Sequence, residues 1–388
     1  MTKTKPHKRI ITNSEISCWK GCPQEHEYRY EIGWRPKGAD NLAALSGSGI
    51  HKGIEWLYLG ETFESCVGAI RALFNGHVTP RMQEIDDPQK YWDARDQTVE
   101  IFKNYITHWW GQDSLTAVHP VTGKPLIEYE FEIPVYTPAG RASKLFSLRG
   151  KVDRVIFDDG EYWIQDHKSK ADLSNKNMLD FLVYDQQMRM YCWATQIYLG
   201  IPIAGADYNL IRRKSHGKPS INKNGEVSVQ SVDMPVDVYT QALVDQDWYL
   251  TSLSEEERKE KKLVSGLNWE KYDKEIERLK NVKWFDRVRQ RYSHDDYRDI
   301  QLEIYHVTRQ MHSCTFPHKA QSSCDHWSGC RFKPICQGLD PEGMFTRSFN
   351  RHPELDQNDF HPPLGKPYKI EDKPKRIGFE NLLDAVNP

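Results

Sequence analysis

One stretch of the chain constrains the fold more than any other, because residues 145–168 have the pattern of a β-hairpin. β-branched and aromatic residues dominate both of its arms, Val152–Phe157 and Tyr162–Asp166. Between the arms lies Asp158-Asp159-Gly160, whose Asp-Gly step is typical of a tight turn between antiparallel strands. The sequence therefore predicts a sheet in which these two strands are neighbours.

The hairpin brings three charged residues together. Asp153 on the first strand would lie beside Asp166 on the second, and Asp166 and Lys168 face the same side of their strand because they are two residues apart. Two close carboxylates repel each other unless a cation lies between them, and oxygen ligands in a partly open site favour Mg²⁺ or Mn²⁺. Such a metal binds phosphate oxygens and lowers the pKa of its water, while Lys168 can orient that water or stabilise developing charge. By itself, an Asp-x-Lys pair is more often a surface ion pair on an edge strand.

Helices and a further strand surround this hairpin in the sequence. Helical spacing of apolar residues recurs before and after it, and Ala204–Ile211 has the pattern of another strand. This order predicts an α/β domain with a central mixed sheet flanked by helices. We expect one domain at 1–345, which contains two helical insertions at 42–112 and 234–312 and a cysteine-rich closing segment at 314–337. An extended tail follows at 346–388.

Overall charge neither supports nor excludes a nucleic-acid partner. The chain has 388 residues and a formal net charge of -2, but a basic groove can coexist with an acidic outer surface. No run approaches the roughly 18 apolar residues of a membrane span, and no apolar run follows the basic residues at the start. We expect a soluble cytoplasmic protein with no membrane partner.

Two further patterns are weak when each is taken alone. His51 follows Gly47 and Gly49 at the start of a predicted helix, and a neutral imidazole there could complete a metal site, although a single histidine is more often structural. Gln187 and Tyr191 are four residues apart on one face of a helix, where they could bond a DNA backbone or Lys168 or pack into the core.

Taken together and in order, these motifs resemble the RecB-like branch of the PD-(D/E)XK nucleases. That branch has a histidine motif, then Gly-x-x-Asp, then Asp/Glu-x-Lys, then Gln-x-x-x-Tyr. The resemblance implies that His51, Asp153, Asp166 and the backbone carbonyl of His167 bind the metal. It also implies catalytic roles for Asp153, Asp166, Lys168, Gln187 and Tyr191.

The cysteines extend the resemblance. Eight are present, and four of them lie between 314 and 336, which in a reducing compartment favours metal ligands over disulfides. Cys22-Pro23 near the start and Cys324, Cys330 and Cys336 near the end resemble the iron–sulfur exonucleases of this branch, the Cas-four-like enzymes. The resemblance implies a [4Fe–4S] cluster bound by these four cysteines. The five-residue gap between Cys324 and Cys330 departs from the usual Cys-x-x-Cys, so Cys314 and Cys18 remain alternative ligands, and Zn²⁺ or unligated thiols remain alternative states.

The resemblance also implies the activity. The expected protein is a metal-dependent DNA exonuclease of phage or bacterial recombination, repair or DNA processing, acting on single-stranded DNA or DNA with single-stranded ends. The preference for exonuclease over endonuclease comes from the resemblance alone. The tail after residue 345 could bind a recombination or replication protein. The alternatives are a non-catalytic nucleic-acid-binding protein with this fold and a DNA endonuclease with a structural zinc ion. Trp109, Trp110 and Trp193 could stack on bases, although core packing is the commoner role.

Overall fold

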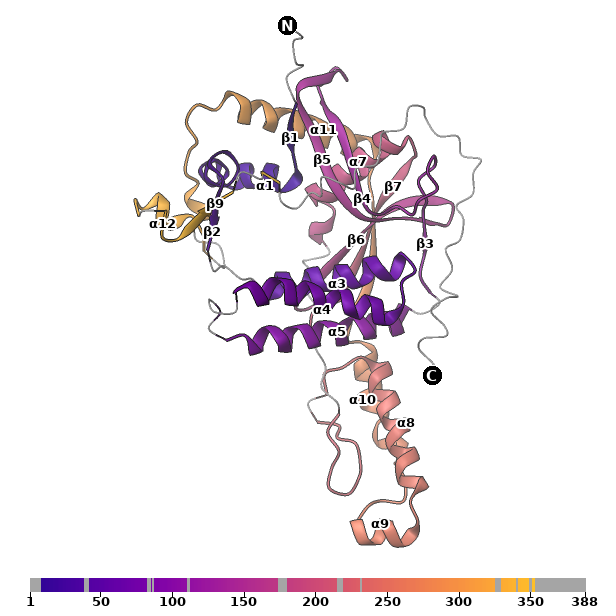
Figure 1. Cartoon of the computed structure of the whole chain (residues 1–388). Coiled ribbons are helices and arrows are strands. Elements are labelled where there is room, and N and C mark those ends of the chain that lie inside the picture. Colours follow the sequence, from indigo (N-terminus) through magenta and orange to yellow (C-terminus); the bar gives the residue numbers. More distant parts are fainter. Residues whose placement is uncertain are drawn as a thin grey trace.

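A seven-stranded mixed sheet lies at the centre of the described part of the chain (Figure 1). The computed structural model describes residues 8–37, 42–81, 85, 87–109, 112–173, 180–214, 219–230, 232–324, 329–339, 341–348 and 351–352. The strands of this sheet are β1 (Arg9–Ile11), β3 (Leu115–Thr116), β4 (Ile127–Tyr136), β5 (Ala142–Asp158), β6 (Glu161–Lys170), β7 (Ile203–Arg212) and β8 (Phe285–Arg291). The mixed α/β fold predicted from the sequence is therefore confirmed.

The predicted hairpin is present as β5 and β6. Asp158 pairs with Glu161, and both Asp159 and Gly160 have positive φ, at 48° and 82°, which is the backbone that a two-residue hairpin turn requires. The β5–β6 pairing runs back from the turn only as far as Arg154 and Gln165. Beyond that point β6 pairs with β7 alone, so the sheet opens at the position where the predicted site begins.

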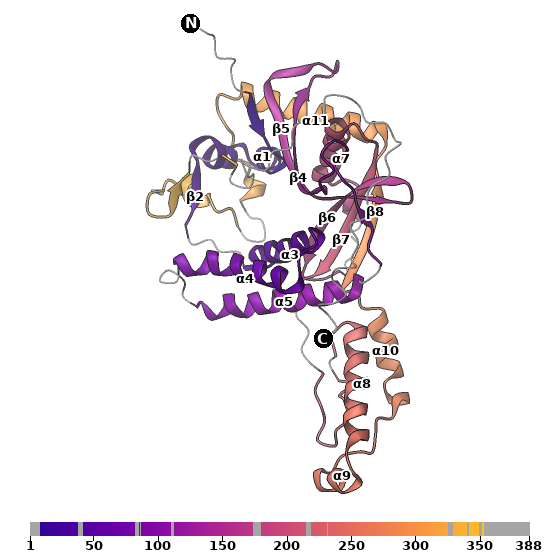
Figure 2. The same ribbon diagram turned by 45° about the vertical axis from the view of Figure 1, so that its right-hand side comes forward.

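Two helical layers enclose the sheet, and each has its own apolar core. Side chains of α7 (Gln186–Leu199) and α11 (His294–Ser313) join those of β4, β6 and β7 in the larger core. On the other side α3 (Leu42–Tyr58), α4 (Phe63–Val78) and α5 (Gln89–Trp109) pack together, and Ile127 and Ile211 from the sheet join that second core. The helices expected over 42–112 are thus three helices of one layer (Figure 2).

The segment 234–312, expected to be helical, contains a strand. β8 pairs antiparallel with β7, from Phe285 opposite Ile211 to Arg291 opposite Gly205. Its sequence lacks the apolar alternation of a strand because its arginines form ion pairs instead, with Arg287 on Asp113 and Arg289 on Asp158 and Asp207. Pairing across the edge of the sheet stabilises this strand, and local sequence patterns do not reveal such pairing.

An arm projects from the end of the sheet near β8 (Figure 1). It consists of α8 (Val236–Ser252), α9 (Glu255–Lys261) and α10 (Asp273–Lys280), and it has a small apolar core of its own that includes Tyr239, Leu243 and Tyr272. None of the helices in the described residues is both long and apolar enough to cross a bilayer.

The two ends of the described chain pack against each other. The first residues form α1 (Asn13–Gly21), α2 (Pro23–His26) and a π-helical turn, Glu27–Ile32. The strand β2 (Trp34–Pro36) then pairs antiparallel with β9 (Phe345–Arg347), and the rings of Phe332 and Phe345 stack at 5.4 Å. We call these first residues, 13–37, together with the described residues of 314–348, the closing module. The predicted tail is therefore attached at its start, while residues 353–388 lie outside the described residues.

Glu15 is the buried centre of this closure. Its carboxylate has no exposed side-chain surface, and it accepts hydrogen bonds from Arg351 at 2.6 Å, Arg9 at 2.8 Å and His26 at 3.0 Å. Burial alone would raise the pKa of Glu15, but hydrogen bonds from His26, His352 and Arg351 hold it far below the ordinary 4.5. A group with a lowered pKa in the folded state stabilises the protein above its ordinary pKa and loses that contribution as the pH falls below it.

We therefore predict that Glu15→Gln lowers the free energy of unfolding at neutral pH by roughly 3 kcal/mol, because it leaves two arginines near a neutral, buried amide. The control is Glu31→Gln, which removes a half-exposed carboxylate from the same arginines and should cost less. Urea unfolding at a series of pH values measures both variants. The difference between wild type and Glu15→Gln should shrink as the pH falls below 4.5; a difference that stays constant with pH would contradict this account.

Candidate active site

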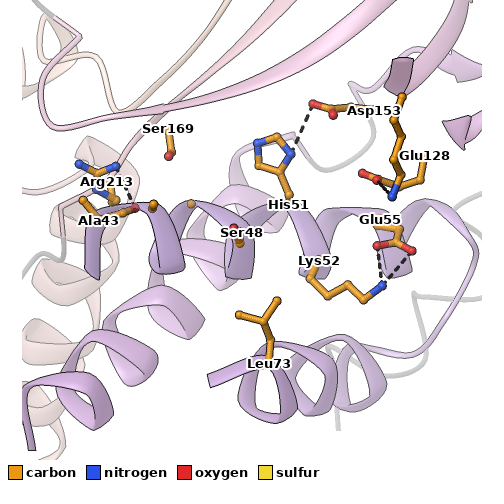
Figure 3. A pocket seen from close by; sticks show the side chains of 13 residues that line it. Ala43, Ser48, His51, Lys52, Glu55, Leu73, Glu128, Asp153, Ser169 and Arg213 are labelled. Carbon is orange, nitrogen blue, oxygen red and sulfur yellow. Dashed lines mark hydrogen bonds and ion pairs between the residues drawn. The ribbon is translucent and has the colours of Figure 1, made fainter. Parts of the chain in front are cut away.

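A cavity of about 520 Å³ lies between α3 and the open part of the sheet. Small residues of α3 (Ala43, Ala44 and Gly47) line one side, and His51 of the same helix points toward Asp153, which also lines the cavity (Figure 3). Gly47 favours this close approach, because a Cβ at this position would lie 2.9 Å from Oγ of Ser169 on β6, which would have to turn away. The cavity therefore exists because a glycine-containing turn of α3 lies close to the strand that carries Asp166 and Lys168.

Asp153 lies where β5 and β6 separate. Its Oδ2 accepts a hydrogen bond from the backbone N–H of His167 at 2.8 Å. Burial alone would raise the pKa of Asp153, but His51 and this hydrogen bond outweigh burial and hold the pKa well below its usual range. Asp153 is therefore a half-buried, ionised carboxylate that faces a cavity.

His51 connects the two predicted metal-binding groups. Its Nδ1 lies 3.4 Å from Oδ2 of Asp153, and its Nε2 lies 2.7 Å from the carbonyl oxygen of His167. Burial lowers the pKa of His51, but the charge of Asp153 outweighs burial and raises it to about 9. In this arrangement an imidazolium supplies positive charge between a carboxylate and a carbonyl, which is the charge that a divalent cation would supply.

Glu128 is a candidate ligand that the sequence analysis did not identify. The β4–β5 register pairs Ile127 with Arg154 and Tyr129 with Val152, so Glu128 lies opposite Asp153 on the same face. Ligand atoms of His51, Glu128 and Asp153 lie within 4.8 Å of one another. Burial, and then the charge of Asp153, raises the pKa of Glu128. This direction is expected for two carboxylates that lie within 4.8 Å of each other.

The backbone at Glu128 is strained, with φ at +48° at the second residue of β4. A non-glycine residue in this region costs of order 1–3 kcal/mol and is typical of functional sites. Neither the register nor this dihedral angle is visible in the sequence, where Glu128 is one of three alternating glutamates in β4.

Asp166 and Lys168 form an ion pair beside these groups. Nζ of Lys168 lies 2.8 Å from Oδ2 of Asp166 and donates to Oε1 of Gln187 at 3.2 Å. Burial lowers the pKa of Lys168, but Asp166 more than compensates and raises it; burial raises the pKa of Asp166. Lys168 is therefore a half-buried ammonium held in place by Asp166 and by Gln187 of the helix α7.

Tyr191 completes this side of the site. Its hydroxyl forms hydrogen bonds with the side chain of Gln187 and the backbone of Lys151. Gly150, three residues before Asp153, leaves room for the ring, since a Cβ there would lie 2.6 Å from Phe131 and 2.9 Å from Tyr191. The structure thus brings His51, Asp153, Asp166, His167, Lys168, Gln187 and Tyr191 together around one place.

The donors in this place suit a hard divalent cation. His51, Glu128 and Asp153 offer one imidazole nitrogen and carboxylate oxygens, with Asp166 and the carbonyl of His167 adjacent. Oxygen-rich sets of this kind favour Mg²⁺ and Mn²⁺. A second group of possible ligands, Glu15, His26 and Glu31, suits a cation poorly because Arg9 and Arg351 already neutralise it.

The predicted cysteine ligands all lie in the closing module, but among the described residues no three cysteine sulfurs lie within 4.8 Å of one another. Burial raises the pKa of Cys330, and the neighbouring Glu25, Cys324 and Cys22 raise it further. The hydroxyl of Tyr28 forms a hydrogen bond with Cys336 and lies close to Cys22, and the backbone N–H of Ala320 donates to Sγ of Cys22 at 3.5 Å.

The two alternative cysteine ligands occupy different positions. Cys18 lies beside Cys22, one turn earlier, and burial raises its pKa to about 12. Cys314 caps the end of α11. Of the aromatic candidates for base stacking, Trp193 is buried in the larger core and Trp109 lies beneath Arg287, with 4.0 Å between guanidinium and ring. Trp110 lies outside the described residues.

Comparisons with known proteins agree with this geometry. No curated protein matches the chain. The sequence model of the PD-(D/E)XK nuclease superfamily matches residues 11–337, which include every strand of the central sheet except the first two residues of β1. The match covers His51, Glu128, Asp153, Asp166 and Lys168 as well as the cysteines of the closing module. The chain therefore belongs to the PD-(D/E)XK nuclease superfamily, whose members are metal-dependent nucleases.

Proposed function

We propose that this protein is a Mg²⁺- or Mn²⁺-dependent deoxyribonuclease that hydrolyses phosphodiester bonds, with exonucleolytic cleavage favoured. The observation that carries the proposal is the meeting of His51, Asp153 and Glu128 in one cavity beside Lys168. The substrate would be single-stranded DNA or DNA with single-stranded ends. Exonuclease action, and a role in phage or bacterial recombination, repair or DNA processing, rest on the resemblance to RecB-like enzymes.

The side chains have separate tasks in this proposal. His51, Asp153 and Glu128 hold the cation, with Asp166 and the His167 carbonyl as further ligands. A cation held there would supply Lewis-acid chemistry toward a phosphate oxygen and a water molecule. Lys168 acts as a fixed ammonium rather than as a base, because Asp166 raises its pKa, and it stabilises the negative charge that develops on the phosphate. Gln187 and Tyr191 position Lys168 and the phosphate backbone next to it.

We predict that Asp153→Ala or Lys168→Ala lowers the cleavage rate of labelled DNA by about 10²-fold or more, because each removes a charge that stabilises the transition state. Lys144→Ala, an exposed lysine near the start of β5, is the control and should leave the rate unchanged. Full activity in either site variant, with an unchanged melting temperature, would refute the assignment. Binding of DNA without any cleavage by wild type would favour a non-catalytic nucleic-acid-binding protein.

Glu128 provides an independent test, because it was found from the structure and not from the motif. We predict that Glu128→Gln raises the Mn²⁺ concentration needed for half-maximal cleavage by about 10-fold to 100-fold. The matched control is Glu132→Gln, which changes a partly exposed glutamate on the same face of the same strand. Identical Mn²⁺ titrations for Glu128→Gln and wild type would exclude Glu128 from the metal site.

A [4Fe–4S] cluster is the second cofactor of the proposal. The proposal is supported by four thiols from opposite ends of the chain, Cys22, Cys324, Cys330 and Cys336, which lie in one module, where Cys22 and Cys324 affect Cys330 electrostatically and the Ala320 N–H donates to the sulfur of Cys22. Burial disfavours the thiolate of Cys330, so a positively charged metal group would compensate for the cost of ionising these thiols. The cluster would be structural and would link the two ends that Glu15 already brings together.

We predict that anaerobically purified protein is brown, absorbs broadly near ~400 nm and contains about four irons per chain, as expected for this cluster type. Cys330→Ser should lose both the colour and the iron, whereas Cys66→Ser, a buried core thiol away from the module, should keep both. If the protein is colourless and contains one zinc per chain, the cysteines bind zinc, as in the alternative, and not an iron–sulfur cluster. The nuclease assignment is unaffected by that result.

A further inference from the structure

A second cavity, of about 380 Å³, lies in the closing module. Its lining comes from α2, the π-helical turn and β2 on one part of the chain and from residues 329–332 on the other, and it includes Arg29, Trp34 and Arg35 together with Arg331 and Phe332. Its volume lies within the range of sites that hold small molecules, roughly 300–1,000 Å³. It is therefore large enough for one nucleotide.

Two arginines of this cavity have no ion-pair partner among the described residues. Several arginines elsewhere do have one, as Arg149 does with Glu130 and Arg287 does with Asp113. By contrast, no carboxylate among the described residues lies within ion-pair distance of the exposed Arg29 or Arg331. Arg35 donates to the backbone carbonyls of Arg29 and Trp34 and so holds the turn in shape.

One carboxylate, that of Glu25, lines the cavity together with three guanidinium groups, those of Arg29, Arg35 and Arg331. Positive charge therefore exceeds negative charge among the described lining residues. A ligand that suits this lining must carry negative charge.

The walls of the cavity also favour a flat ring. Trp34 is the half-buried ring of the lining; it packs edge-on against Phe345, and the guanidinium of Arg347 lies 5.9 Å from its centroid. Phe332 is buried between Tyr28 and Phe345 and supports the wall from behind. Arginine next to aromatic surface is the combination that proteins use to bind single strands, because every base can stack and every nucleotide has a phosphate. An acidic peptide would satisfy the arginines but would leave the aromatic surface without a matching group.

We propose that this cavity is a second nucleic-acid site, which holds one nucleotide of a single strand away from the catalytic cavity, with its phosphate on Arg29 and Arg331. The proposal rests on the proposed deoxyribonuclease function for the identity of the ligand. The two cavities are close along the chain: Pro36 lines one and Ala43 lines the other, and seven residues span at most roughly 25 Å. A strand in the catalytic cavity therefore needs only a few more nucleotides to reach this site.

The test is a measurement of binding in EDTA, by fluorescence anisotropy, with labelled oligothymidylates of increasing length. Wild-type affinity should rise in a step once the strand is long enough to reach the second cavity. In Arg29→Gln/Arg331→Gln that step should disappear, with roughly tenfold weaker binding of the long strands and unchanged binding of the short ones. The slope of the logarithm of the binding constant against the logarithm of the salt concentration should also become shallower, by about 0.7 for each phosphate that the variant no longer neutralises.

The control is Arg298→Gln/Arg309→Gln, which removes two exposed arginines from α11 and should keep the step. A second readout is photocrosslinking of a bromouracil-containing long strand, which should label the peptide that contains Trp34. A step that persists in the Arg29/Arg331 variant, or that disappears equally in the control, would overturn the proposal. The proposal would also be overturned if an acidic peptide competes with the long strand for the wild-type protein and no crosslink to Trp34 forms. Because EDTA prevents cleavage, these outcomes are separate from those that test the nuclease activity.

Discussion

The hydrogen bond from the His167 N–H to the Asp153 carboxylate is the interaction on which the site depends. In a continuous ladder this N–H would bond a carbonyl of β5, and the two strands would remain side by side. Instead, pairing between β5 and β6 ends at Arg154 and Gln165, and β6 continues against β7 alone. The opening lets a half-buried carboxylate, a backbone carbonyl and the imidazole of His51 face one cavity. The ion pair of Lys168 and Asp166 then lies beside them at a fixed position.

The remaining structure supports that opening from outside. The helix α3 brings His51 to the strands because Gly47 permits close approach to Ser169, and α7 supplies Gln187 and Tyr191 from the opposite layer. The closing module joins residues more than 300 positions apart through β2, β9 and the Glu15–Arg351 ion pair. These contacts among protein groups close the module without any metal.

The sequence predicted those parts of the molecule that depend on local patterns. The Asp-Gly turn and the alternation of its strands were sufficient to predict the β5–β6 hairpin, and with it the proximity of Asp153, Asp166 and Lys168. Glu128 could not be predicted, because its place beside Asp153 depends on the β4–β5 register and on a strained dihedral angle. The strand β8 was missed because ion pairs with distant residues, rather than apolar alternation, stabilise it. The attachment of residues 345–352 depends on Glu15 and β2, which lie at the other end of the chain.

Anomalous diffraction from crystals grown with Mn²⁺, recorded at the manganese absorption edge, tests the central claim most directly. The account predicts a strong peak in the cavity between α3 and the sheet, bound by Asp153 and His51, with the carboxylate of Glu128 or Asp166 alongside. The imidazole of His51 would then have exchanged its contact with Asp153 for a contact with the metal. A cavity without a peak, at Mn²⁺ concentrations that support DNA cleavage, would contradict the account, because the catalytic metal would then have to bind elsewhere.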